Sequence, residues 1–203
     1  MWKLNPTKIM TQVRYERGSH IQERTQRFIK ALGYQTLSAG HNSTGIGPAF
    51  SVMCGQGEMS RTNRLITPEY GHTVGMFRYV TDLPVPNEKP IDAGIWKFCH
   101  SCKKCAEECA EGEGGPPMWD EPSWDIIGPW NTVGKKAFYD DRRKCSAYRG
   151  LPGACTSGKC MSVCTFTKHR LAGIHDVVQA TAATTPIFNS FFRTMDDVFY
   201  GNG

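Results

Sequence analysis

The sequence lacks long apolar runs, and this limits the kind of protein that it can encode. No stretch approaches the ~20 consecutive apolar residues that a transmembrane helix requires. The start, MWKLNPTKIM, has no uninterrupted apolar core, no twin arginine and no small-residue cleavage site, so it does not have the features of an export signal. If Met1 is the true start, we expect a soluble chain that is not exported.

The sequence also lacks a strong excess of charge of one sign. It has 24 Lys and Arg against 19 Asp and Glu, a formal net charge of +5. The basic residues of segment 14–30 alternate with Glu16 and Glu23, which is typical of a solvated helix face, so we expect no nucleic-acid partner. With 39% hydrophobic residues, the 203-residue chain has a globular composition and is long enough for one domain or two small ones.

Cysteine, in contrast, is abundant and concentrated. Eight of the nine cysteines lie between Cys99 and Cys164. The stretch FCHSCKKCAEECA, residues 98–110, separates its four cysteines by two, two and three residues, which is too close for an ordinary disulfide framework. This run binds a [4Fe–4S] cluster in bacterial ferredoxins. The isolated Cys54 is expected to be a buried apolar residue.

A second cysteine group follows, with spacings of nine, four and three residues. In two-cluster ferredoxins the fourth cysteine of each run binds the other cluster. That pattern gives one cluster the ligands Cys99, Cys102, Cys105 and Cys164, and the other Cys109, Cys145, Cys155 and Cys160. Ala110 and Thr165 replace the usual proline after each run, and the second group is less regular. A pair of zinc sites is the alternative, because four thiolates also bind zinc.

The remaining sequence predicts a mixture of helices and strands. Apolar spacing predicts a helix over 7–32, with a break at Gly18, a capping box from Ser19 to Gln22 and a stop at Gly33. Strands are predicted at 34–39, 64–67 and 76–81, and a helical tail at 171–199, broken near Pro186. The glycine-rich loop GHNSTGIGP (40–48) would let backbone approach a ligand closely, and the proline-rich 82–92 is a connector.

The residues before and around the first cysteine run resemble those of a known enzyme family. The stretch RTNRLITPEYGHTVGMFRYVTDLPVPNEKPIDAGIWKFCHSCKKCAEECA (61–110), with FIKALGYQ before it and WNTVGKKAFYDDRRKC after it, closely resembles the corrinoid-dependent reductive dehalogenases of organohalide-respiring bacteria. The resemblance covers nearly the whole chain.

The resemblance implies an α+β fold and an oxidoreductase acting on carbon–halogen bonds. A nitroreductase-like α/β domain binds base-off cobalamin, and a ferredoxin-like domain with two [4Fe–4S] clusters covers it. Electrons pass through the clusters to Co(II), and the Co(I) formed attacks a small halogenated substrate, here of the chlorinated-ethene type. The implied domains are 1–92, the C-terminal part of the corrinoid domain, 93–170, the cluster domain with a Trp-rich insertion at 111–143, and 171–203, a helical tail.

The resemblance also implies catalytic residues. Tyr15 is expected to be the proton donor, and Asn42 is expected to contact it and the substrate. Thr11, four residues from Tyr15 on the same helix face, is expected to line the substrate pocket. Family members often place an arginine after TPEYG that stabilises the phenolate. Here that position is Gly75, so Arg78, Arg14 or backbone would have to replace it.

Further residues are implied for the substrate pocket and the corrinoid. Trp124 and Trp130, and more weakly Trp119, fall where family members line the substrate pocket, although packing of the loop is the alternative. The residues expected to hydrogen-bond to the corrinoid are Ser38, Gly40, His41 and Ser43.

Family enzymes are longer than this chain. They have an export signal, lie at the outer face of the cytoplasmic membrane, and work with a membrane-anchor subunit and a respiratory electron donor. We therefore expect this chain to be the C-terminal half of such an enzyme, exposing apolar surface and unable to turn over alone. Two alternatives remain, namely a two-cluster ferredoxin-type electron carrier and an epoxyqueuosine-reductase-like corrinoid enzyme.

Overall fold

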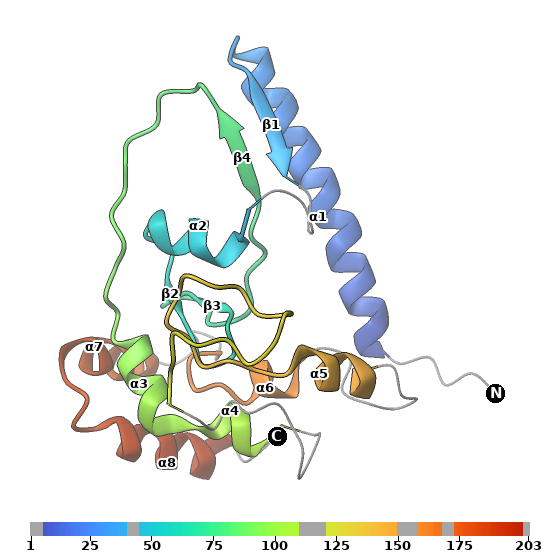
Figure 1. Cartoon of the computed structure of the whole chain (residues 1–203). Coiled ribbons are helices and arrows are strands. Elements are labelled where there is room, and N and C mark those ends of the chain that lie inside the picture. Colours follow the sequence, from blue (N-terminus) through green and yellow to red (C-terminus); the bar gives the residue numbers. More distant parts are fainter. Residues whose placement is uncertain (1–5, 40–44, 110–120, 150–157, 168–172, 201–203) are drawn as a thin grey trace. The chain divides into compact units, whose positions relative to one another are not determined.

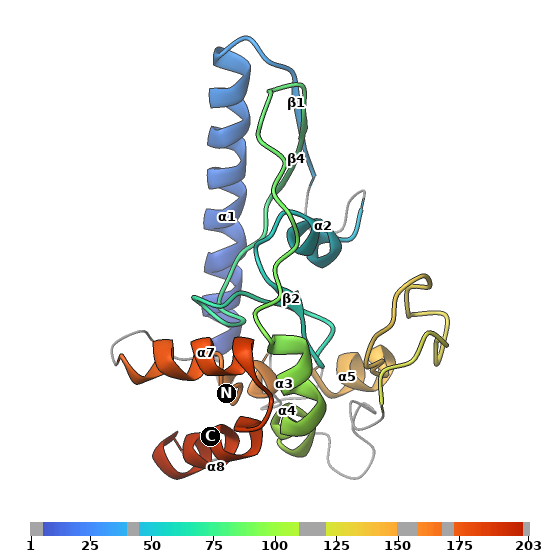
Figure 2. The same ribbon diagram turned by 90° about the vertical axis from the view of Figure 1, so that its left-hand side faces the viewer.

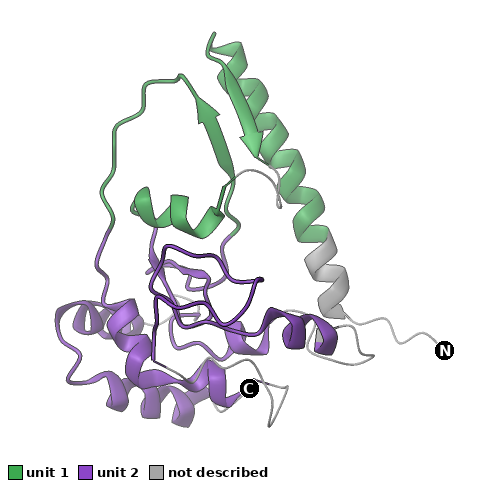
Figure 3. Ribbon diagram, viewed as in Figure 1, with its two compact units in different colours: residues 1–55, 75–90 green, residues 56–74, 91–203 purple. Residues whose placement is uncertain are grey.

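The computed structural model describes residues 6–39, 45–109, 121–149, 158–167 and 173–200 of the chain (Figure 1). These residues form helices and short antiparallel strands, so the fold is α+β, as predicted. They divide into two units, which are coloured separately in Figure 3. Unit 1 comprises residues 1–55 and 75–90, and unit 2 comprises residues 56–74 and 91–203.

Unit 1 combines one long helix with a two-stranded sheet. Its elements are α1 (Pro6–Ala31), β1 (Thr36–Ala39), α2 (Gly47–Met53) and β4 (Arg78–Thr81). Strands β1 and β4 pair antiparallel, with Thr36 opposite Thr81, and α1 runs alongside them (Figure 2). Polar contacts join the helix to the sheet: the Gln22 side chain donates to the Ala39 carbonyl (2.7 Å) and that of Gln26 to the Thr36 carbonyl (3.2 Å).

The predicted break at Gly18 is wrong, because α1 is continuous through this residue. Gly18 is buried, and a Cβ added there would lie 3.1 Å from the Phe77 ring. The glycine is therefore explained by close packing and not by a helix end. The capping box is also wrong, since the Ser19 hydroxyl donates to the Tyr15 carbonyl inside the helix (3.0 Å).

The predicted stop of this helix is confirmed. Gly33 has a φ of 94°, and the N–H groups of Gly33 and Tyr34 bond back to the carbonyls of Lys30 and Ile29. Only glycine adopts this left-handed conformation at little cost, so the helix ends here.

Unit 2 contains the cysteine region and the C-terminal helices. Its elements are β2 (Glu58–Met59), β3 (Leu65–Ile66), α3 (Ile95–Cys102), α4 (Lys104–Glu107), α5 (Arg142–Arg149), α6 (Lys159–Ser162), α7 (Ile174–Thr184) and α8 (Asn189–Tyr200). Figures 1 and 2 both show α7 and α8 beside α3 and α4. The break in the C-terminal tail near Pro186 is confirmed.

An apolar core organises unit 2 around helix α3. Its buried members are Ile66, Ile95, Phe98, Cys99, Phe138, Phe166 and Ala182. Ile95, Phe98 and Cys99 follow the three- and four-residue spacing that places side chains on one face of a helix. The Glu58 carboxylate accepts hydrogen bonds from the N–H groups of Ala93 (2.5 Å) and Trp96 (2.7 Å), which ties β2 to the start of α3.

The two units differ from the implied domains, because the tail 171–203 is part of unit 2 and does not form a third unit, and because segment 56–74 changes sides. Residues 56–74, which the implied boundary at 92 puts in the first domain, belong to unit 2. Gly71 shows how tightly they pack there, because a Cβ at this residue would lie 2.3 Å from the Phe166 carbonyl oxygen. The segment 56–74 therefore contributes directly to the surroundings of the cysteines.

Candidate functional site

The cysteines predicted to bind the first cluster lie around one cavity of unit 2. Cys99 and Cys102 are on α3, Cys105 is on α4, and Cys164 follows α6. The cavity is lined by Ser60, Arg61, Thr62, Ile66, His72, Phe98, Cys99, Cys102, Lys103, Lys104, Cys105, Cys164 and Phe166. The structure thus brings together four thiols from three separate segments, which is the ligand number of a [4Fe–4S] cluster.

A left-handed residue gives the first cysteine run its turn. Lys103 has a φ of 51° and stands between the end of α3 and the start of α4. This conformation is uncommon for a residue other than glycine. It interrupts the helix between Cys102 and Cys105, and both cysteines line the same cavity.

Burial dominates the ionisation of these thiols. Desolvation, reinforced by the neighbouring cysteines, raises the pKa of Cys99 and Cys105 well above the ordinary value, and raises that of Cys164 to about 12. Without metal these groups are therefore neutral thiols at pH 7. Metal binding requires thiolates, so loading the cavity must release protons.

A buried ion-pair network lies beside the cavity. The Lys104 ammonium is 2.6 Å from a carboxylate oxygen of Asp196 and 2.6 Å from one of Asp197, and the side chains of Lys104 and Asp196 are 2% and 4% exposed. Although desolvation opposes the charged form, the two carboxylates raise the pKa of Lys104. Arg193 also bonds to Glu107 of α4. Salt bridges therefore join helix α8 to α4, which carries part of the first cysteine run.

Two further polar residues of segment 56–74 face the same cavity. The Arg61 side chain is buried, donates to the carbonyls of Cys99 (2.9 Å) and His100 (3.2 Å), and has its guanidinium carbon 4.0 Å from the centre of the Phe138 ring. His72 is buried and its Nδ1 has no hydrogen-bond partner. Burial, and secondarily the charge of Arg64, lowers the pKa of His72 to about 4.

The second cysteine group is described in part. Cys145 lies on α5, Cys160 on α6 and Cys109 just after α4, while Cys155 lies outside the described residues. Helices α4 and α6 are neighbours, and the salt bridge from Lys159 to Glu108 (2.8 Å) joins them. The Arg64 guanidinium donates to Cys160 Sγ at 3.7 Å.

The spacing of the metal-ligand side chains is a further feature of the described ranges. There, no cluster of three or more His, Cys, Asp or Glu side chains is placed to hold one metal ion. In a cubane cluster each thiolate binds a different iron, so its cysteines stand apart around the group. None of the eight described cysteines forms a disulfide.

Most of the predicted catalytic and corrinoid-binding residues lie outside the described part of unit 1. The residues outside are Asn42 and the predicted corrinoid contacts Gly40, His41 and Ser43. Of Thr11 the backbone is described but the side chain is not. The Ser38 hydroxyl donates to Gln26 Oε1 (2.9 Å). Tyr15 is 43% exposed on α1, and the Arg14 guanidinium carbon is 4.9 Å from its ring centre. Arg78 instead donates to the Gly45 carbonyl.

The predicted pocket tryptophans belong to the loop before α5. Trp124 is 65% exposed, whereas Trp130 is half-buried, with the Arg143 guanidinium carbon 3.8 Å from its ring centre. Trp119 lies outside the described residues. The structure does not bring Trp124 and Trp130 to the cysteine-lined cavity.

Some outcomes could not be read from the sequence. Cys54 was expected to be buried, but it is exposed after the end of α2, so that prediction is wrong. Sequence reasoning also missed Arg61, His72 and Lys104 at the cavity. Arg61 and His72 lie inside the stretch that carries the resemblance, and Lys104 lies between two predicted ligands, but only the folded chain shows that they are buried together.

Comparisons with known proteins agree with the resemblance. Residues 1–85 match the family described as reductive dehalogenase subunit. The chain is 39% identical to a trichloroethene reductive dehalogenase of Dehalococcoides mccartyi strain 195 over 93% of its own length and 32% of that protein. It is 35% identical to a tetrachloroethene reductive dehalogenase of Sulfurospirillum multivorans, covering 86% of this chain and 34% of that one. The chain thus spans about one third of the length of these curated relatives.

Solved structures show the same fold. A reductive dehalogenase whose structure suggests a mechanism for B12-dependent dehalogenation aligns with a TM-score of 0.71 and 24% identity, covering 88% of this chain and 25% of that one. The catabolic enzyme NpRdhA in complex with 3-bromo-4-hydroxybenzoic acid aligns with a TM-score of 0.71 and 25% identity, over 87% of this chain and 24% of that one. Within the described ranges, no helix has the length and apolarity needed to span a membrane.

Proposed function

Since this chain is a relative of the reductive dehalogenases, we propose that it takes part in the reductive dehalogenation of small halogenated organics during anaerobic organohalide respiration. The net reaction replaces a carbon–halogen bond with a carbon–hydrogen bond. It takes up two electrons and one proton and releases a halide ion. Unit 2 would deliver the electrons, and unit 1 would contribute to the site of the reaction.

The observation that carries this proposal for unit 2 is the cavity lined by Cys99, Cys102, Cys105 and Cys164. Four thiols, a buried histidine nitrogen without a partner and nearby cationic side chains suit an anionic iron–sulfur group. A [4Fe–4S] cluster bound there would supply one-electron transfer. We also propose that unit 2 is a ferredoxin-like domain, with a second cluster on Cys109, Cys145, Cys155 and Cys160.

The chain's own residues hold the first cluster site together before any metal binds. Helix α3 presents Cys99 and Cys102 from a packed core, and the turn at Lys103 aims Cys105. Because Arg61 and Lys104 beside the cavity are buried, their charges act more strongly than they would in solvent.

For unit 1 we propose part of a nitroreductase-like corrinoid-binding domain. Ser38 is the one predicted corrinoid contact among the described residues, and its hydroxyl donates a hydrogen bond to Gln26. The described residues therefore do not by themselves form a cradle for a corrinoid, and we derive no step through that group.

Tyr15 is proposed as the proton donor in unit 1, with Asn42 beside it. The position expected for the stabilising arginine is Gly75, but Arg14 lies 4.9 Å from the centre of the Tyr15 ring. A guanidinium over an aromatic ring is a cation–π contact, which places a positive charge beside the proposed donor. Arg14 therefore supports the proposed role better than Arg78, which bonds to the Gly45 carbonyl.

Chlorinated ethenes are the proposed substrates, because the curated relatives cited above act on trichloroethene and tetrachloroethene. A structural relative bound to 3-bromo-4-hydroxybenzoic acid makes halogenated phenols the competing class. Trp124 and Trp130 are proposed to line the pocket. A membrane-anchor subunit, a respiratory electron donor and a location at the outer face of the cytoplasmic membrane are proposed for the whole protein.

The proposal is tested on protein purified anaerobically with cobalamin supplied. Iron, cobalt and zinc are measured per chain, and halide release is followed with trichloroethene or 3-bromo-4-hydroxybenzoate and a strong reductant. About eight irons with cobalt, and chloride release by the whole protein, are expected. Iron without cobalt would instead indicate a ferredoxin-type electron carrier, and zinc in place of iron would overturn the electron-transfer role.

A further inference from the structure

The connection between β2 and β3 reaches both groups of cysteines. This turn, residues 60–64 (SRTNR), carries one arginine near each end. Arg61 bonds to backbone carbonyls of Cys99 and His100, and Arg64 bonds to the sulfur of Cys160. In the proposed ligand assignment, Cys99 belongs to one cluster and Cys160 to the other.

Hydrogen bonds within the turn fix the positions of the two arginines. The Ser60 hydroxyl bonds to the hydroxyl of Thr62 (2.7 Å) and to the carbonyl of Arg64 (2.9 Å). Asn63 has a φ of 55°, and its amide group donates to the carbonyl of Phe138 (2.5 Å). Ser60, Arg61 and Thr62 are each no more than 2% exposed. The turn is therefore part of the core and not a surface loop.

Arg61 acts on the end of helix α3. The carbonyls of Cys99 and His100 belong to the last four of this helix, which have no partner within it. The Nε and Nη2 groups of Arg61 occupy these two acceptors at 2.9 Å and 3.2 Å. A fork of two donors holds the helix end in one orientation, and that end carries Cys99 and Cys102.

Arg64 acts on a sulfur atom directly. Its Nη1 donates to Cys160 Sγ at 3.7 Å. Hydrogen bonds to ligand sulfurs are among the factors that set the reduction potential of an iron–sulfur cluster. A donor that carries a positive charge stabilises the more negative reduced state, so it makes the cluster easier to reduce.

We propose that the Ser60–Arg64 turn serves both clusters, with Arg61 positioning the ligands of the first and Arg64 raising the reduction potential of the second. This inference rests on the proposed function, because it requires that both cysteine groups bind clusters. The two arginines act differently, one through carbonyls and one through sulfur. Substitutions at the two positions should therefore have separable effects.

The experiment uses protein loaded anaerobically with iron and sulfide, and follows the reduced clusters by electron paramagnetic resonance during a redox titration. Arg64→Gln is expected to move the midpoint of one cluster to a more negative potential at unchanged iron content. Arg64→Lys, which keeps the charge, should shift it less. Arg27→Gln is the matched control, since it removes the same charge from an exposed helix position in unit 1.

Arg61→Gln is expected to reduce iron content from about eight to about four atoms per chain, with the signal of the second cluster retained. Should this variant not fold, Arg61→Lys provides the same readout, because a single ammonium cannot reproduce the fork of two donors. Loss of both clusters together in Arg61→Lys would overturn the separate role of Arg61.

The inference alone fails if both clusters assemble and Arg64→Gln leaves both midpoints unchanged, or shifts them no more than Arg27→Gln does. If the unsubstituted chain takes up no iron, the proposed function fails and this inference fails with it. Absence of halide release from a chain that carries both clusters would count against the proposed reaction only. The two failures are therefore distinguishable.

Discussion

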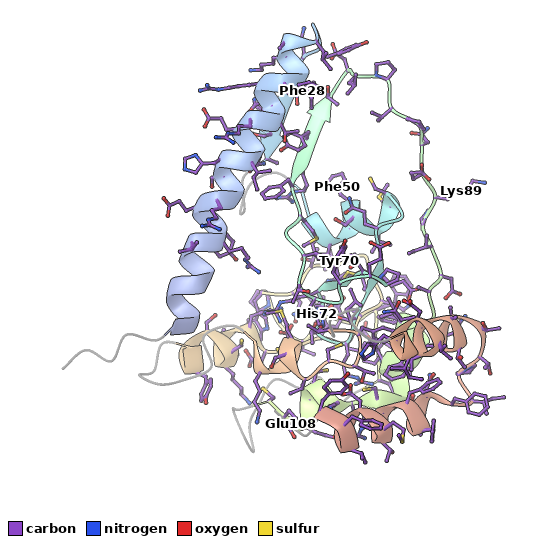
Figure 4. The ribbon with its side chains drawn as sticks, turned by 180° about the vertical axis from the view of Figure 1, so that it is seen from behind. Phe28, Phe50, Tyr70, His72, Lys89 and Glu108 are labelled. Carbon is purple, nitrogen blue, oxygen red and sulfur yellow. The ribbon has the colours of Figure 1, made fainter. Side chains whose placement is uncertain are left out.

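Unit 1 and unit 2 are stabilised in different ways. In the described part of unit 1, Ile29 is the one buried apolar side chain, and side-chain amides join the helix to the sheet. Unit 2 has a contiguous apolar core and buries charged residues beside it. Figure 4 shows His72 among the crowded side chains of unit 2 and Phe28 on α1 of unit 1. Both units leave large apolar side chains exposed, so the comparison concerns the interior: unit 2 is organised around a contiguous apolar core, and the described part of unit 1 has no comparable one.

The largest expected difference between the two units is the loss of stability when a phenylalanine is truncated to alanine. Phe98 is 1% exposed and packs edge-on against Phe166, with ring centres 5.1 Å apart. Phe98→Ala should destabilise unit 2 by about 3–5 kcal/mol through lost burial and the cavity left behind. Phe28→Ala is the control in unit 1, where the ring is 63% exposed and loses little on truncation. Denaturant unfolding measures both, and equal losses would contradict the contrast.

The buried ion pair is the next most sensitive feature of unit 2. Lys104→Met would remove the ammonium that lies 2.6 Å from the Asp196 carboxylate, which is 4% exposed, at a cost of about 3 kcal/mol. The control Lys97→Met removes an exposed lysine from α3 and should cause no resolvable change. Thermal unfolding of the two variants makes the comparison. A Lys104→Met protein as stable as the parent would show that the network contributes no net stability.

Acid should affect unit 2 through His72. Burial and the Arg64 charge lower the pKa of this histidine from 6.5 to about 4, so the unfolded chain binds a proton between these values and the folded chain does not. Stability should therefore fall as the pH decreases from 6.5 to about 4, by up to about 3 kcal/mol from this group, and show no further loss from it below that. Unfolding of metal-free His72→Gln at several pH values should show a flatter profile, whereas the exposed control His20→Gln should keep the parent profile.

The rate of thiol labelling compares the accessibility of a cysteine in unit 1 with that of a cysteine in unit 2. In the metal-free chain at pH 7, Cys54 of unit 1 is exposed, while Cys99 of unit 2 is buried and its raised pKa keeps it a neutral thiol. Iodoacetamide should therefore modify Cys54 at least ~10-fold faster, as followed by mass spectrometry. Faster modification of Cys99 would mean that unit 2 opens without metal. A Cys54→Ser variant identifies the rapidly labelled peptide.

The smallest expected effect concerns the packing inside unit 1. Alanine favours a helix interior over glycine by about 1 kcal/mol, but a Cβ at Gly18 would lie 3.1 Å from the Phe77 ring. Gly18→Ala should therefore be nearly neutral, and it should stabilise by about 1 kcal/mol when Phe77→Ala removes the ring. A double-mutant cycle of unfolding free energies measures this coupling. Equal effects in both backgrounds would show that the ring yields freely.

The sequence by itself determined the local features whose physical cause is local. Gly33 ends α1 because glycine accepts a positive φ, and Pro186 separates α7 from α8 because proline disrupts a helix. The cysteine spacing predicted metal ligands, since cysteines two residues apart converge on one site. The residues of the stretch 61–110 were specific enough to predict the similarity to reductive dehalogenases that the comparisons also find.

Tertiary structure alone decided the features that depend on partners distant in sequence. Gly18 was read as a helix break because its packing partner, Phe77, is remote in sequence. The burial of Lys104 depends on α8, more than ninety residues away, where Asp196 supplies the opposite charge. Arg61 and Arg64 look like ordinary surface arginines in the sequence. The folded chain directs one to the end of α3 and the other to Cys160, because hydrogen bonds and burial fix the turn that carries them.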